Sequence, residues 1–256
     1  NSIRLAYNTK NVDIGILKAW VYNTSEIQGR IDAEGKISGL IRNPRIETEF
    51  KLVKPVYENY SLQTLDGNIS LNDSLLEINS NLILSDSISK IIISGKLPLS
   101  PSSGWNIDTS QQNRKAYVQL KSETFDLAGL RSLFPMLISA QGPGALTITA
   151  TNSSGSWLLD GNFSADTCFI NYLPLHISAS KVVIRSLISG TLFKPEIIFT
   201  AKTNDIKLQT STVTSSFWKG SYHQDTISLD TGFARFENGG FLQVKGDITI
   251  SSIDSL

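Results

Sequence analysis

The chain has 256 residues, and 40% of them are hydrophobic, which is enough to bury a sizeable apolar surface in one large domain or two small ones. Lys plus Arg and Asp plus Glu both total 23, so the overall charge offers no general attraction for nucleic acid or for an anionic membrane surface. One cysteine, Cys168, excludes an internal disulfide, and no run of about 18 apolar residues is present to span a bilayer as a helix.

The clearest local pattern lies between Gly29 and Arg42. Its odd positions carry Gly, Ile and Ala, its even positions carry charged or polar residues, and only Leu40 departs from this alternation. Successive side chains of a strand point to opposite faces, so the pattern predicts a long strand with one apolar and one charged face. After a turn predicted at Asn43-Pro44, the alternation resumes from Arg45 to Leu52 in the opposite phase.

The same alternation continues along most of the chain, with Gly-, Asn- and Pro-containing turn signals between the segments. Strands at this spacing predict an all-β, antiparallel architecture. The polar stretch from Ser100 to Arg114 predicts a long loop. We therefore expect a single elongated segment over residues 1–256, with two possible sub-blocks, 1–100 and 115–256, joined by that loop.

Residues 125–134 depart from the strand period. Leu127 and Leu130 recur at helical spacing, Asp126 is placed to cap a first turn, and Pro135 is placed to end the run. We expect one short helix near residues 125–134, and a loop with buried leucines is the alternative.

A loose internal repeat is also visible. Gly29–Leu52 combines a glycine-led alternating strand, a proline-containing turn and a second alternating strand, and Gly190–Ala201 echoes that order. The repeat length varies, so the pattern suggests a repeated unit without defining its length.

Residue types that carry catalysis are scarce. Cys168 is expected to be a small, buried or half-buried apolar residue, because a catalytic thiol needs a basic neighbour and only His176 and His223 could supply an imidazole. His176 is expected on a solvent-facing side of a strand, and the residues that follow His223 lack the spacing of metal ligands. The sequence therefore predicts no metal site and no cofactor.

Two carboxylates, Glu47 and Glu49, share one strand face with Arg45 and Lys51. This neighbourhood favours an ion-paired surface strip over a catalytic acid and base, so we expect no catalytic residue and no enzyme. A carbohydrate-active enzyme is an alternative that would need two carboxyls about 5 to 10 Å apart in a polar cleft.

The apolar faces of the predicted strands need a cover. A second sheet, closure into a filled barrel, or an apolar ligand held by a curled sheet would each supply one. Long strands, together with Gly35 and Gly39 as bending points, favour the third arrangement: a long antiparallel sheet curled into an elongated, U-shaped hydrophobic groove. The residues expected to line this groove are Ile31, Ala33, Ile37, Ile41, Ile46, Phe50, Leu52, Ile69, Leu71, Leu76, Ile78, Leu82, Leu84, Ile91, Ile93, Leu97, Leu146, Ile148, Trp157, Leu159, Phe163, Leu173, Leu175, Ile177, Phe199, Ile206, Leu208, Leu242, Val244, Ile248 and Ile250.

Three segments resemble repeats of the AsmA-like family, and of its TamB branch in particular. They are GRIDAEGKISGLIRNPRIETEFKL at 29–52, FDLAGLRSLFP at 125–135 and GGFLQVKGDITI at 239–250. The resemblance extends over most of the chain through degenerate motifs. It implies an elongated β protein with an inner hydrophobic groove, often called a β-taco or repeating β-groove, in the periplasm of a diderm bacterium.

The function that the resemblance implies is non-enzymatic. The groove would shield lipid acyl chains or apolar peptide strands, for phospholipid transport to the outer membrane, for outer-membrane protein assembly, or for both. The implied partners are phospholipid or another apolar ligand, an outer-membrane barrel protein of the TamA kind, and flanking repeats of the same chain, with no nucleic acid.

The sequence opens on Asn1 and shows neither a signal peptide nor the membrane anchor of the family, so we expect an internal segment of an inner-membrane-anchored protein. A closed β-sandwich or solenoid, serving as an adhesion or structural module without a ligand, is the alternative function. The two functions differ in what covers the apolar face.

Overall fold

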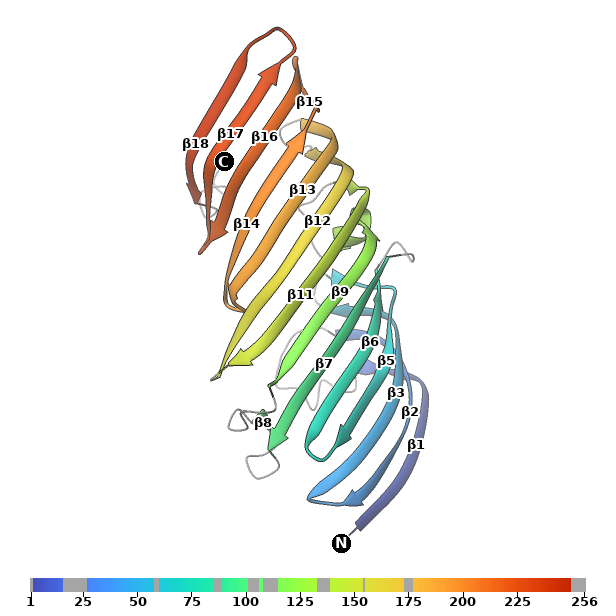
Figure 1. Cartoon of the computed structure of the whole chain (residues 1–256). Helices are drawn as coiled ribbons and strands as arrows, with labels where there is room; N and C mark the ends of the chain where they lie inside the picture. Colours follow the sequence, from blue (N-terminus) through green and yellow to red (C-terminus); the bar gives the residue numbers. More distant parts are fainter. Residues whose placement is uncertain are drawn as a thin grey trace. The chain divides into compact units, whose positions relative to one another are not determined.

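A computed structural model describes residues 2–15, 27–57, 60–84, 89–100, 106–107, 115–132, 139–153, 155–172 and 177–249. Nearly all of these residues lie in antiparallel strands, which confirms the predicted all-β class (Figure 1). The chain divides into two compact units. Unit 1 comprises Asn1–Lys121 and Thr151–Ser156, and unit 2 comprises Ser122–Ala150 and Trp157–Leu256. In the described part of the chain, no helix is long and apolar enough to cross a membrane.

Unit 1 is built from strands that pair with one another in chain order. Two-residue strands are inserted beside longer ones at two places, and β9 continues into unit 2. The strands are β1 (Ser2–Asp13), β2 (Ile27–Leu40), β3 (Asn43–Tyr57), β4 (Tyr60–Ser61), β5 (Thr64–Asn72), β6 (Leu75–Ile83), β7 (Lys90–Ser100), β8 (Asn106–Ile107) and β9 (Tyr117–Asp126).

Unit 2 repeats this organisation. Each long strand pairs antiparallel with the next, and the short β15 extends the pairing of β14 between β13 and β16. Its elements are the 3₁₀ helix η3 (Leu127–Ser132), β10 (Ser139–Gln141), β11 (Pro143–Ser153), β12 (Ser156–Tyr172), β13 (Ile177–Thr191), β14 (Lys194–Thr203), β15 (Asp205–Leu208), β16 (Ser211–His223), β17 (Thr226–Phe236) and β18 (Phe241–Thr249).

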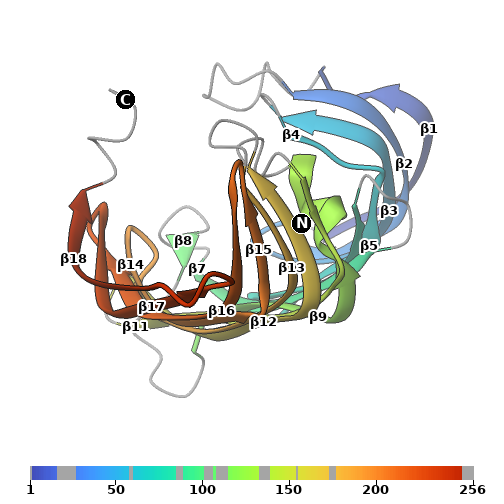
Figure 2. The ribbon, with the colours of Figure 1, turned by 90° about the horizontal axis from the view of Figure 1, so that it is seen from above.

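The strands are long and bent. β3 has 15 residues and β12 has 17, and Figure 2 shows the long strands of both units as arcs. The register of β2 runs unbroken through Gly35, so no β-bulge accompanies the bending point expected at that glycine. Register shifts instead accompany non-glycine residues in the left-handed region, such as Asn11 at φ 58° and Lys181 at φ 53°. These are β-bulges, which bend a strand and increase its twist.

The hairpin between β2 and β3 places its turn two residues earlier than the sequence predicts. The turn consists of Ile41 and Arg42, whereas Asn43 and Pro44 already belong to β3. Pro44 lies opposite Gly39, whose φ is +94°. Proline is accepted here because the first residues of a strand tolerate a missing backbone N–H.

The predicted short helix is not confirmed. Leu127–Ser132 form a six-residue 3₁₀ helix, and Phe125 is still part of β9. The capping role expected for Asp126 is present, because its Oδ1 accepts hydrogen bonds from Ala128 N at 2.8 Å and Gly142 N at 3.1 Å. The remainder of the predicted helix, residues 133–134, lies outside the described residues.

Two glycines with positive φ generate a first prediction. Gly190 has a φ of +88°, and a methyl group there would lie 2.6 Å from Lys194 O, whereas Gly239 has a φ of +87° with nothing within 4 Å. Gly239→Ala should lower the free energy of unfolding by about 1 kcal/mol through backbone strain alone. Gly190→Ala should lower it by about 2–4 kcal/mol, because the close contact adds to that strain. Guanidinium unfolding measures both losses, and equal losses would contradict the close approach of Gly190 to Lys194 O.

Candidate functional site: an apolar sheet face

The candidate site of unit 1 is one face of its sheet, which we call the apolar face of unit 1. Antiparallel register aligns alternate residues of consecutive strands into four rows that cross the strands. At about 4.8 Å between strands, a row of six strands is about 24 Å long and a row of seven is about 29 Å long. The rows are Leu5, Ile37, Ile46, Leu71, Leu76, Leu97; Tyr7, Gly35, Thr48, Ile69, Ile78, Gly95, Val118; Thr9, Ala33, Phe50, Gly67, Ser80, Ile93, Leu120; and Val12, Ile31, Leu52, Leu65, Leu82, Ile91.

Solvent access varies along these rows. Leu71 and Ile91 are buried, at 6% and 5% exposure, whereas Leu5 at the β1 end is 50% exposed. Most other members are half-buried. Apart from β8, the described strands of unit 1 all belong to a single sheet, so they provide no second sheet to cover this face.

Unit 2 has an equivalent face, the apolar face of unit 2. Its rows contain more glycine and serine than those of unit 1, and their β18 end is open, with Leu242 45% and Ile248 44% exposed. Three rows are Gly161, Ile188, Ile197, Tyr222, Ile227, Ile248; Phe163, Ser186, Phe199, Gly220, Leu229, Gly246; and Ala165, Ile184, Ala201, Trp218, Gly232, Val244.

Aromatic rings on both faces lie over glycines of the neighbouring strand. A methyl group at Gly232 would lie 2.6 Å from a ring carbon of Trp218, and one at Gly220 would lie 3.1 Å from the ring of Phe199. In unit 1, Tyr7 reaches across Gly35 to β3, where its hydroxyl is 2.6 Å from Thr48 Oγ1. Glycine therefore provides the space that each ring occupies beside the neighbouring strand.

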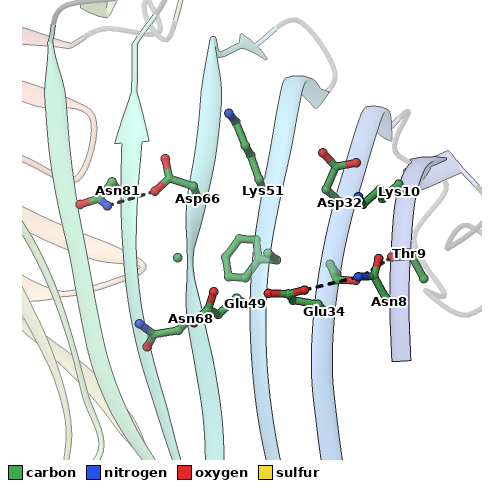
Figure 3. Close-up of a pocket in the computed structure, with 13 residues that line it drawn as sticks. Asn8, Thr9, Lys10, Asp32, Glu34, Glu49, Lys51, Asp66, Asn68 and Asn81 are labelled. Atoms are coloured by element: carbon green, nitrogen blue, oxygen red, sulfur yellow. Dashed lines mark hydrogen bonds between the residues drawn. The ribbon is translucent and has the colours of Figure 1, made fainter. Parts of the chain in front are cut away.

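The opposite face of unit 1 is polar. Figure 3 shows two rows of side chains there, and a furrow of about 480 Å³ runs between them. One row holds Asn8, Glu34, Glu49 and Asn68. The other holds Asp32, Lys51, Asp66 and Asn81.

Hydrogen bonds on this polar face join neighbouring strands. Asn8 donates to Glu34 at 3.4 Å, and Asn81 donates to Asp66 at 3.1 Å. Within the described residues, Glu47 and Glu49 have no ion pair within 4 Å, which corrects the expected ion-paired strip.

The furrow brings two carboxylates together without making an acid–base pair. Glu34 and Glu49 face each other directly across β2 and β3, and both side chains are exposed. General acid catalysis by a carboxyl needs a drier environment for one member of the pair. The furrow therefore provides a hydrated, charged surface.

The structure places two of the other candidate reactive groups, His223 and Cys168. His223 Nδ1 lies 3.4 Å from Glu196 Oε1 at the β16–β17 hairpin, and His176 lies outside the described residues. No group of His, Cys, Asp and Glu suited to a metal ion occurs among the residues that the structure describes. Cys168 is buried, and its Sγ donates a hydrogen bond to Val182 O at 3.2 Å.

Most of the residues expected to line a groove lie on these two faces. Ile41 is a correction, because it belongs to the β2–β3 turn and is 60% exposed. Leu84 follows β6 and is fully buried, and Ile148 packs beside Gly161. The expected positions that lie outside the described residues are Leu173, Leu175 and Ile250.

Several residues of the apolar faces were not among the expected ones. β1 contributes Leu5 and Tyr7, and its alternation with Arg4 and Asn8 is a signal that indicates a strand. β16 contributes Trp218, but its strand reads STVTSSFWKGSYH and shows no clear apolar period. Trp218 can be assigned to the apolar face only when its pairing with Gly232 is known, so the sequence alone does not indicate this position.

The contact between Trp218 and Gly232 generates a second prediction. Gly232→Ala should lower the free energy of unfolding by about 1–3 kcal/mol, because the new methyl group displaces the ring. In a Trp218→Leu background the same change should cost much less, giving a coupling of about 0.5–3 kcal/mol in a double-mutant cycle measured by guanidinium unfolding. An equal cost in both backgrounds would show that the ring does not occupy that space.

The buried thiol generates a third prediction. Burial raises the pKa of Cys168, so the thiol should remain neutral at a pH where an unfolded cysteine ionises, and its stabilising contribution should fall only as pH rises past about 8.5. A thiol reagent should modify the folded chain slowly at pH 8 and the guanidinium-unfolded chain rapidly. Rapid modification of the folded chain would contradict the burial.

Comparisons with known proteins leave the family open: no family model, no curated protein and no solved structure matches this chain.

Proposed function

We propose that the apolar face of unit 1, and the equivalent face of unit 2, hold lipid acyl chains or apolar peptide segments. The observation that supports this proposal is the alignment of large aliphatic side chains, such as Ile37, Ile46 and Leu76, into rows that remain half-exposed. Exposed apolar rows of this length are unfavourable in water, at roughly 25 cal/mol per Å².

The dimensions of the rows suit an acyl chain. A row of six strands is about 24 Å long, and one leaflet of a bilayer has a hydrocarbon depth of about 15 Å. Each buried methylene contributes about 0.8 kcal/mol, and similar side chains along a row would spread this contribution evenly. A bound acyl chain would then meet no single position of much higher affinity and could shift along the row. This movement needs no catalytic group.

The resemblance to AsmA-like proteins supports a wider proposal. In that setting the chain is a periplasmic segment of a diderm bacterium that shields phospholipid on its way to the outer membrane, or assists the assembly of outer-membrane proteins. Its partners would be phospholipid, a TamA-like barrel and flanking repeats of the same chain. The apolar faces carry the argument, and the resemblance supplies only the cellular setting.

A matched pair of variants in β6 tests the proposal. Ile78 lies in the middle of a row, and the next residue, Asn79, is exposed on the polar face. Ile78→Asp should remove lipid that co-purifies with the protein, as measured by mass spectrometry. An acyl chain lying over the new carboxylate would have to displace its water of hydration, which is unfavourable. Asn79→Asp should leave that lipid in place, and both variants should keep the β-rich circular dichroism of the parent.

Two results would contradict the proposal. If Ile78→Asp unfolds the chain while Asn79→Asp does not, Ile78 belongs to a closed core, as in a ligand-free sandwich. If the parent carries no lipid and takes none up from micelles, the faces do not hold acyl chains.

A further inference from the structure

Two hairpins, one in each unit, are constructed alike at their tips. In unit 1 the tip joins β2 to β3 through the turn Ile41-Arg42, and in unit 2 it joins β13 to β14 through the turn Leu192-Phe193. Each turn follows a glycine in the left-handed region, with φ of +94° and +88°. That glycine pairs with a proline in both hairpins, Gly39 with Pro44 and Gly190 with Pro195.

Both tips expose large apolar side chains. Leu40 and Ile41 are each 60% exposed, Leu192 is 51% exposed and Phe193 is 90% exposed. Turn positions normally carry Gly, Asn, Asp, Ser or Pro, and a single exposed apolar residue needs no explanation. The same feature at the same place in two hairpins is a recurrent property of the fold.

The tip of unit 1 is also positively charged. Arg42 is in the turn, and Arg4 and Arg45 flank Ser38 in one cross-strand row beside it. All three arginines are exposed, and within the described residues none has an ion pair within 4 Å. The chain has no net charge, so three unpaired cations beside two exposed apolar residues are a local concentration.

We propose that the β2–β3 tip, formed by Leu40, Ile41 and Arg42 with Arg4 and Arg45 beside it, docks on an anionic lipid membrane surface. Leu40 and Ile41 enter the boundary between the lipid headgroups and the acyl chains, and the three neighbouring arginines contact lipid phosphates. This inference goes beyond the proposed function, because it concerns the rim of the sheet and holds whether or not the apolar face carries lipid.

Charge and exposure together favour a membrane over a nucleic acid. A nucleic acid would pair with the arginines but would leave Leu40 and Ile41 in water. The β13–β14 tip has an exposed apolar pair, Leu192 and Phe193, with one cation beside it, Lys194. The neighbouring ionisable side chains, Glu196 and His223, lie next to each other. This tip is therefore expected to insert in the same way with less dependence on anionic lipid.

Vesicle sedimentation with the full chain tests the proposal. The parent should sediment with vesicles of phosphatidylcholine and phosphatidylglycerol, should bind vesicles of phosphatidylcholine alone far more weakly, and should be released by added salt. The double variant Arg42→Gln/Arg45→Gln should bind roughly 25-fold more weakly, the effect of two surface cations. Leu40→Ser/Ile41→Ser should lower binding at least about tenfold.

Matched controls lie elsewhere on the same unit. Lys10→Gln/Lys51→Gln removes two exposed cations, each six residues or about 20 Å along its own strand from Arg4 or Arg45, which is beyond the Debye length. Ile92→Ser removes an apolar residue that is 46% exposed in β7. Both controls should bind as the parent does, and so should Ile78→Asp, so a failure of lipid holding and a failure of membrane docking are separate results.

A fluorescent label gives a second measurement that does not depend on loss of binding. An environment-sensitive dye on Ile41→Cys, in a Cys168→Ser background, should shift to the blue with the anionic vesicles. The proposal is overturned if the parent does not sediment with these vesicles, if the tip variants bind as well as the controls, or if the dye remains in water while the chain sediments. A dimer lost in the tip variants would assign the tip to a second copy of the chain and would also overturn it.

Discussion

The antiparallel register is the constraint on which the rest of this structure depends. Hydrogen bonding between strands fixes Ile37 opposite Ile46, and Ile46 opposite Leu71, so side chains far apart in sequence share one row. A slip of one residue in any strand would transfer its apolar side chains to the charged face. The two faces of each unit, one apolar and one polar, are therefore a consequence of backbone pairing combined with a sequence period of two.

That period is why much of the fold was predictable. A face that is at least half-buried tolerates few charges, so Ile31, Ala33 and Ile37 stand out from Asp32, Glu34 and Lys36 without any knowledge of the partner strands. The antiparallel class then follows from the length and spacing of the alternating segments. The polar face could be predicted as well, since charged residues occupy the alternate positions of the same strands.

The turns were harder to place, because their chemistry here opposes the usual signals. Asn43-Pro44 is typical of a turn, yet the chain turns at Ile41-Arg42 and takes the proline into β3 opposite Gly39. Ile41 was consequently assigned to the apolar face, although it is exposed at the hairpin tip. A local signal cannot separate an apolar residue in a turn from one at the end of a strand. The 3₁₀ helix after Asp126 shows the same limit, since a short run of leucines fits several local conformations.

The aromatic residues depended on pairings that the sequence does not contain. Trp218 fits on the apolar face because Gly232, on the next strand, leaves room for its ring, and Phe199 uses Gly220 in the same way. Such contacts depend on the register of two strands, so no local period in the sequence indicates them.

Residue-level photolabelling tests the central claim most directly. A phospholipid that carries a diazirine in its acyl chain would be bound to the protein and activated by light. Mass spectrometry of peptides would then identify the labelled residues. In β5 the label should mark Ile69 and Leu71, and should spare Asn68 and Ser70 between and beside them. Labelling of both parities to the same extent, or no labelling of β5 at all, would contradict an apolar face that holds acyl chains.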